Sequence, residues 1–154
     1  MKKKIFYLLS FTFLLLQACS NSGSSDGSSS SSTSGSLVGK WESYQVGTFA
    51  PGTIITDSTP LMNQQFDCPT LKDYCQFGSQ GSIKVVTYNT SCAEGGGIGT
   101  YTKIDNFINI YQNNVFQVTW EIISLTSTTL KIKYPSPATG TPDVIVVASL
   151  KKIQ

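Results

Sequence analysis

The sequence of 154 residues contains no histidine and no arginine, so each of its 11 basic residues is a lysine. Histidine is the commonest general base at neutral pH and the commonest metal ligand. Arginine is the usual group for binding phosphate or carboxylate through two parallel hydrogen bonds. Without histidine, we predict no catalytic residues, metal site or cofactor. Without arginine, and without a cluster of lysines after residue 4, we predict no nucleic-acid partner.

The sequence also lacks the run of roughly 20 apolar residues that a transmembrane helix needs. Its apolar run at residues 5–16 is shorter and follows the three lysines at positions 2–4. A basic segment, a short apolar segment and then small residues are typical of a secretory signal peptide, which we assign to residues 1–18. Its removal leaves eight lysines against nine acidic residues, a side-chain charge of −1.

The leader ends in Leu16-Gln17-Ala18-Cys19, which resembles the lipobox of bacterial lipoproteins. The resemblance implies that Cys19 carries diacylglycerol and that its new amino group is acylated, for example with palmitate. Several acyl chains make a strong anchor, so the membrane is the first expected partner. Ser20 is not the aspartate that retains lipoproteins at the inner membrane in enteric bacteria. We therefore expect the protein at the outer membrane, facing the periplasm.

Residues 19–36 are mostly serine and glycine, with a single acidic residue. Such a composition offers almost nothing to bury and is typical of a flexible linker. A coil of this length has an average reach of about 20–25 Å. We therefore expect a disordered tether between the lipid and a single folded domain at residues 37–154.

The folded domain is predicted to be all-β. Phe116, Val118, Trp120 and Ile122 alternate with polar residues, the period of a half-buried strand. The expected strands are residues 40–46, 74–77, 82–88, 99–104, 107–111, 116–122, 130–134 and 143–153, with 53–56 as a further short candidate. We expect turns at residues 78–81, 105–106 and 113–114, and burial on both faces at 144–147. Eight or nine short strands of this kind indicate an up-and-down barrel or a sandwich.

The opening Leu37-Val38-Gly39-Lys40-Trp41 resembles the Gly-x-Trp start of lipocalin-like domains. Later features resemble small lipocalin-like lipoproteins of bacterial envelopes: Cys68 followed by Lys72-Asp73, the turn at residues 77–81, Cys92, and the segment at residues 125–130. The chain departs from that pattern in the spacing after Cys68 and in its additional Cys75. The resemblance implies a small antiparallel barrel of about eight strands with an internal ligand site.

Two functions are compatible with this pattern. In the first, the barrel is a non-catalytic binding module for a small apolar ligand, and an internal cavity of roughly 300–1,000 Å³ would favour it. In the second, the domain binds or inhibits an envelope protein through its loops at residues 47–67 and 88–98. Four aromatic side chains are candidates to line the ligand site or to fill the core: Trp41, Phe77, Phe116 and Trp120. The glycine-rich residues 94–99 are expected to form a mobile loop.

Three cysteines remain if lipid occupies Cys19, and an oxidising compartment favours a disulfide between two of them. A turn centred between residues 79 and 80 places Cys68 opposite position 91, immediately before Cys92. The same register places Cys75 opposite Lys84, and at strand rise that is about 25 Å from Cys92, whereas a disulfide needs Cα atoms within about 7 Å. We therefore predict a Cys68–Cys92 disulfide and a buried free thiol at Cys75.

Overall fold

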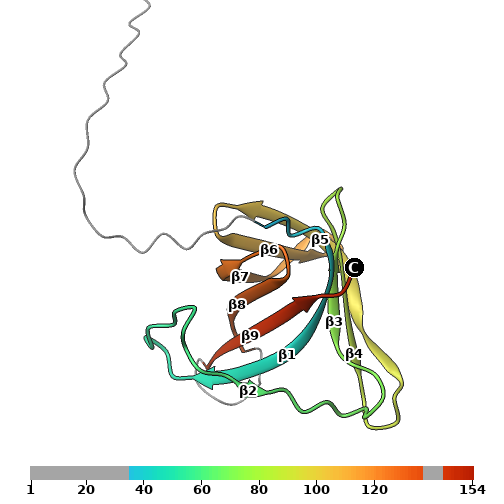
Figure 1. Ribbon diagram of the computed structural model, residues 1–154. Coiled ribbons are helices and arrows are strands. Elements are labelled where there is room, and N and C mark those ends of the chain that lie inside the picture. The colour runs from blue at the N-terminus through green and yellow to red at the C-terminus, as the bar shows by residue number, and fades with distance from the viewer. Residues whose placement is uncertain (1–34, 137–143) are drawn as a thin grey trace, which may run out of the picture.

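The computed structural model describes residues 35–136 and 144–154, and their regular elements are all β-strands (Figure 1). The strands are β1 (Gly39–Phe49), β2 (Met62–Asn63), β3 (Tyr74–Phe77), β4 (Ser82–Tyr88), β5 (Glu94–Ile104), β6 (Phe107–Gln112), β7 (Val115–Leu125), β8 (Thr129–Pro135) and β9 (Ile145–Lys152). Among these residues no helix is long and apolar enough to cross a membrane. The predicted signal peptide, Cys19 and most of the linker lie outside the described residues.

The strands form one antiparallel sheet in the order β2-β1-β3-β4-β5-β6-β7-β8-β9. β1 also pairs with β9, from Trp41 opposite Lys152 to Phe49 opposite Ile145. This pairing closes β1 and β3 to β9 into a barrel of eight strands, while the two-residue β2 pairs with β1 beyond the end of β3. The predicted all-β, up-and-down barrel is confirmed, and closure protects the strand edges that an open sheet would expose.

The predicted turns lie where the chain adopts positive φ. Asn113 and Asn114, between β6 and β7, have φ of 51° and 63°. Asp105, between β5 and β6, has φ of 51°. Asparagine, aspartate and glycine tolerate this conformation better than other residues, so these positions fix where the hairpins reverse.

β3 and β4 form the predicted hairpin, but their register differs by one residue from the prediction. Cys75 lies opposite Val85 instead of Lys84. The Gly78 N–H donates to the Ser82 carbonyl oxygen at 2.8 Å, so the connecting loop has an odd number of residues. The prediction assumed an even number, and this difference moves each cross-strand pair by one position.

Phe116 was predicted to face the interior with Trp120, and this assignment is wrong. Its side chain is 55% exposed on the outer surface. Ile110 of β6 pairs with Val118 of β7. The next residue of β6, Tyr111, pairs with Phe116, so β7 has one extra residue at this point. Such a β-bulge reverses the alternation of side chains, so Trp120 stays on the inner face and Phe116 moves to the outer face.

The glycine-rich residues 94–99, predicted to be a loop, form the first half of β5 and pair with β4. Gly96 has φ of 102°, and a Cβ atom there would lie 2.1 Å from the Val85 carbonyl oxygen. A Cβ atom on Gly99 would lie 2.2 Å from the Tyr111 carbonyl oxygen. Glycine is needed here because neighbouring backbone passes too close for a side chain.

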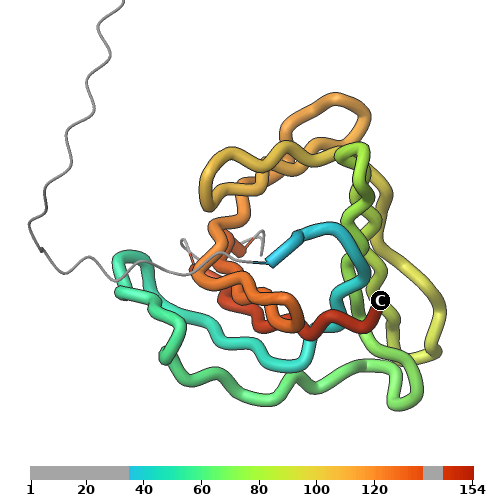
Figure 2. The backbone as a smooth tube through the Cα atoms, turned by 45° about the horizontal axis from the view of Figure 1, so that its top comes forward, coloured from blue at the N-terminus to red at the C-terminus, as the bar shows by residue number. Residues whose placement is uncertain are grey.

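One end of the barrel, which we call the closed end, is filled by side chains and covered by the start of the domain. Trp41 is fully buried and its indole N–H donates to the Leu37 carbonyl oxygen at 2.7 Å. Leu37 is itself buried in the core. In Figure 2 the blue segment at the start of the domain crosses the barrel at this end. The chain therefore enters the domain by closing one end of the barrel.

An outer layer of chain covers part of the outer face of the sheet, the face that points away from the barrel interior. The buried Lys131 of β8 donates from its Nζ to the carbonyl oxygens of Asp57 and Thr59, at 2.6 and 2.9 Å. Ser124 of β7 donates to the Asp57 carboxylate at 2.6 Å. These bonds hold residues 50–61 against the barrel. The segment contains no strand, so the predicted strand at 53–56 is wrong.

The last strand is buried on both faces, as predicted, but the buried stretch lies further along the chain than the predicted residues 144–147. Burial is continuous from Val147 to Leu150, whereas residues 144–146 are only partly buried. Ala148 and Leu150 belong to the inner core. Val147 faces outward opposite Gly47, where a Cβ atom would lie 2.8 Å from Leu61 of the outer layer. The outer layer thus accounts for burial on the second face.

Candidate functional site

The barrel interior contains a cavity of about 170 Å³ at the end opposite Leu37. We call this end the mouth, where β1 and β4 end and β3 begins. The cavity is lined by Ser43, Val46, Gln64, Asp73, Tyr74, Cys75, Val85, Val86, Thr87, Trp120, Ile132, Tyr134, Ala148 and Leu150. Of the four predicted aromatic residues, Trp41 and Phe77 fill the core, Trp120 lines the cavity and Phe116 does neither.

Two aromatic rings form one side of the cavity. The ring centroids of Trp120 and Tyr134 are 5.6 Å apart, and Trp120 also contacts Phe77 edge to face at 6.3 Å. Burial raises the pKa of the Tyr134 phenol, and the nearby Cys75 acts in the same direction. The cavity therefore offers an aromatic surface with a neutral hydroxyl group beside it.

Cys75 is the free thiol of the described residues, as predicted, and its side chain lines the same cavity. Burial raises the pKa of this thiol to about 12. A reactive cysteine needs a thiolate near neutral pH, and Cys75 is a neutral thiol there. Its surroundings fit a soft, apolar contact with a ligand and do not fit a nucleophile.

Polar groups gather at the mouth. The Ser43 hydroxyl donates to the Gln64 side-chain carbonyl oxygen, and the Gln64 N–H donates to the Tyr44 carbonyl oxygen at 2.9 Å. The Asp73 carboxylate accepts the Tyr88 N–H at 2.9 Å. An apolar interior with a few polar groups at its opening is the usual arrangement of a small-molecule site.

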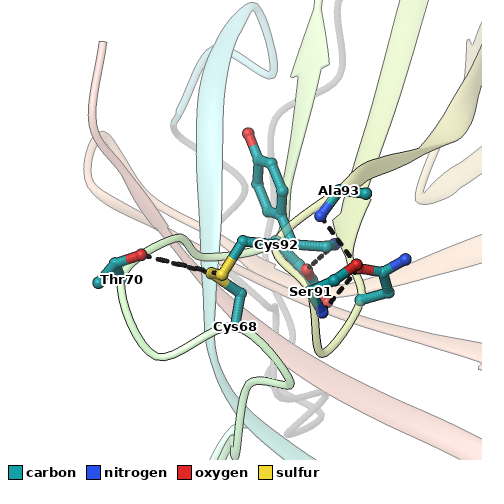
Figure 3. Close-up of a disulfide and its surroundings, with 8 residues drawn as sticks. Cys68, Thr70, Ser91, Cys92 and Ala93 are labelled. Carbon is teal, nitrogen blue, oxygen red and sulfur yellow. Dashed lines mark hydrogen bonds between the residues drawn. A yellow bond between two sulfur atoms is a disulfide. The ribbon is translucent and has the colours of Figure 1, made fainter.

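The predicted disulfide is present and braces the mouth. Cys68 and Cys92 are bonded, with Cα atoms 4.9 Å apart (Figure 3). The bond joins the segment before β3 to the turn after β4. In the observed register, extension of the β3–β4 pairing would place Cys68 directly opposite Cys92, one position closer than predicted. The observed register thus favours this disulfide more strongly than the predicted register does.

The turn that carries Cys92 is organised by one asparagine. The Asn89 side-chain oxygen accepts hydrogen bonds from the N–H groups of Ser91 and Ala93, both at 3.0 Å. Cys92 has φ of 59°, a conformation that such a tight turn requires. Figure 3 shows Ser91, Cys92 and Ala93 in this arrangement beside Cys68. Asn89 therefore positions Cys92 for its disulfide partner.

Sequence reasoning missed Lys131, whose side chain is buried even though lysine is rarely buried. Burial lowers the pKa of its ammonium group, and the nearby Asp57 acts in the opposite direction. The alternation in β8 places Lys131 on the outer face, which gives no hint that another segment covers it. Among the described residues no group of three or more histidine, cysteine, aspartate or glutamate side chains is placed to hold a metal ion.

Solved structures with similar folds share little sequence with this chain. An uncharacterised protein from Bacteroides eggerthii is 14% identical, covers 77% of this chain and 100% of its own, and has a TM-score of 0.46. Bovine odorant binding protein, solved with its natural ligand, is 15% identical, with coverages of 86% and 78% and a TM-score of 0.46. A deswapped triple mutant of the bovine protein is 16% identical, with coverages of 76% and 74% and a TM-score of 0.45.

Comparison with curated proteins gives no match. A sequence model of the lipocalin-like domain matches residues 37–132. The match covers more than half of the chain, and it begins at Leu37, the first buried residue of the part that the structure describes. The lipocalin-like fold is typically a non-catalytic binding fold, and no enzyme family is indicated. The chain therefore belongs to the family of lipocalin-like domains.

Proposed function

We propose that this protein is a non-catalytic binding module that holds a small apolar ligand in its barrel while a lipid at Cys19 anchors it to the bacterial cell envelope. The observation that carries the binding proposal is the cavity of about 170 Å³ with Trp120 and Tyr134 on its wall. Membership of the lipocalin-like family supports a binding role.

The size of the cavity limits the ligand. Sites for drug-sized molecules usually have volumes of about 300–1,000 Å³, so this cavity lies below the range expected from the sequence. An apolar cavity of about 150 Å³ is nevertheless large enough for benzene. The volume therefore fits a ligand with one ring, or a short branched chain, and a few further atoms.

Ala148 offers a direct test, because its small side chain lines the cavity on β9. The substitution Ala148→Phe should occupy the cavity and exclude a ligand. Mass spectrometry of small molecules that copurify with the wild-type protein should detect species that are missing from the Ala148→Phe protein. Identical extracts from the two folded proteins would contradict a ligand in this cavity.

The lipobox-like residues that end at Cys19 support the anchoring proposal, and Ser20, in place of an aspartate, supports the outer membrane as the site of attachment. On this proposal the protein is attached to the outer membrane and faces the periplasm. The chain enters the barrel at its closed end, beside Leu37. The mouth is at the other end, so a tethered domain can turn it away from the membrane and keep it open to ligands.

Replacement of Cys19 by serine tests the anchor. The Cys19→Ser protein should lose the incorporation of labelled palmitate and should leave the membrane fraction. Palmitate incorporation that persists in this variant would contradict lipidation at Cys19.

A second candidate function, binding of an envelope protein through the loops, is favoured by the ordered outer layer. This segment and the adjoining β2 expose Ile54 at 86% and Met62 at 75%, so both apolar side chains are accessible to a protein partner. A double substitution of Ile54 and Met62 by serine should abolish crosslinking to an envelope protein if this function holds. It should leave the cavity and its copurifying molecules unchanged.

A further inference from the structure

Asp73 is the only charged residue among the described residues that line the cavity. The described ion pairs join lysines to glutamates: Lys72 to Glu42, Lys84 to Glu94 and Lys133 to Glu121. No lysine of the described chain pairs with Asp73. Among the described residues, the mouth of the cavity therefore carries a carboxylate that forms no ion pair with a lysine.

The backbone holds Asp73 firmly at the mouth. Asp73 lies immediately before β3 and lines the same cavity as Cys75. One carboxylate oxygen, Oδ1, accepts the Tyr88 N–H at 2.9 Å, and the Asp73 carbonyl oxygen accepts the Ser43 N–H at 3.1 Å. The second carboxylate oxygen has no donor among the described residues, so it is available to a ligand.

The position of this carboxylate selects the charge of a ligand. Beside an apolar cavity, water screens a charge less well than in bulk solution, so attraction and repulsion both grow. A ligand ammonium group at Asp73 would form a charge-assisted hydrogen bond, which is stronger than a neutral one. A ligand carboxylate would be repelled, and a neutral apolar ligand would gain nothing from Asp73.

We propose that the cavity binds compact amphipathic amines, with the apolar body against Trp120 and Tyr134 and the ammonium group at Asp73. This inference rests on the proposed function, because it names the class of ligand for the same cavity. The volume of about 170 Å³ admits a body with one ring. The opening next to Asp73 leaves the ammonium group partly in water, so its desolvation costs less than full burial would.

Three probes of similar shape test the charge preference: 2-phenylethylamine, propylbenzene and 3-phenylpropionate. Isothermal titration calorimetry on the full-length protein at neutral pH compares their dissociation constants. We expect the amine to bind about tenfold more tightly than propylbenzene and the carboxylate to bind more weakly than both. In the Asp73→Asn protein the amine should lose its advantage over propylbenzene.

Asn at position 73 keeps an oxygen that can accept the Tyr88 N–H, so this variant should fold. Thermal unfolding of the variant checks this. Asp67→Asn is the matched control, because Asp67 is exposed and does not line the cavity; it should keep the preference for the amine.

The outcomes separate this inference from the proposed function. Equal binding of the amine and propylbenzene, or an amine preference that survives in folded Asp73→Asn protein, would overturn the amine inference and leave the apolar site standing. Failure of all three probes to bind would overturn both.

Discussion

Trp120 and Tyr134 lie on the same wall of the barrel interior, with ring centroids 5.6 Å apart and planes inclined by 34°. They come from β7 and β8, neighbouring strands that pair along the barrel. Phe77 contacts Trp120 on the side of the filled core. The pair therefore marks the boundary between the packed half of the barrel and its cavity.

Trp120 should contribute strongly to stability even though it lines the cavity. Trp120→Ala removes the contacts with Phe77 and Tyr134 and enlarges the cavity, so the free energy of unfolding should fall by about 3–5 kcal/mol. Thr119→Ala is the control, because it removes only one partly exposed hydrogen bond, to Asn109, and should cost about 1 kcal/mol. Urea unfolding measures both. Equal losses would show that the inner face is wrongly assigned.

The Cys68–Cys92 disulfide should be important for stability. It closes a chain segment with a sequence separation of 24 residues, for which the chain-entropy model gives about 3.5 kcal/mol. The double substitution of Cys68 and Cys92 by alanine should lower the free energy of unfolding by roughly this amount. Peptide mapping without reduction provides the independent check, and a linked peptide that contains Cys75 would contradict the structure.

Cys75 should make stability decrease in alkaline solution. The pKa of its thiol rises from an unfolded value of 9.0 to about 12 in the folded protein. Below pH 9 both states hold the proton. Between pH 9 and 12 the unfolded state loses it first, so the folded state loses stability relative to the unfolded state as pH rises.

The full effect is about 4 kcal/mol, from 1.36 kcal/mol per pKa unit. Other groups also titrate in this range, so the measurement is the difference between the wild-type and Cys75→Ala proteins at each pH. This difference should change steadily between pH 9 and 12. A constant difference would show that the Cys75 thiol is not buried.

Lys131 should hold the outer layer on the barrel. Lys131→Met removes two hydrogen bonds from a charged donor to the carbonyl oxygens of Asp57 and Thr59. The amides of residues 53–59 should then exchange hydrogen faster, and the free energy of unfolding should fall by about 1–3 kcal/mol.

Lys133→Met is the matched control for this change, since Lys133 lies on the same strand and face. Its ion pair with Glu121 is partly exposed, and such pairs contribute about 0–1 kcal/mol. If the two variants change hydrogen exchange equally, Lys131 does not anchor the segment.

The sequence predicts most of the barrel because most of its strands carry a local signal. Alternation marks β7 and β8, and the Asn113-Asn114 and Asp105-Asn106 pairs mark the hairpins. Irregularities in pairing leave no such signal. Gln117 is an ordinary polar residue, yet the bulge beside it places Phe116 outside.

Other features depend on contacts between segments distant in sequence. The glycines of β5 form a strand because the backbones of neighbouring strands pass close to them, and glycine carries no side-chain alternation for a pattern to detect. The burial of Lys131 requires residues 50–61 to fold over β8. The cavity likewise depends on which side chains meet across the barrel, so its residues were only partly predicted.

Ligands should enter the cavity beside Trp120, and the two tryptophans provide an internal comparison. Trp41 is buried at the closed end and donates to Leu37, whereas Trp120 lines the cavity. A ¹H–¹⁵N NMR titration with propylbenzene should shift the indole N–H signal of Trp120 saturably and leave that of Trp41 nearly unchanged. No saturable shift at Trp120, or an equal shift of both signals, would contradict binding in this cavity.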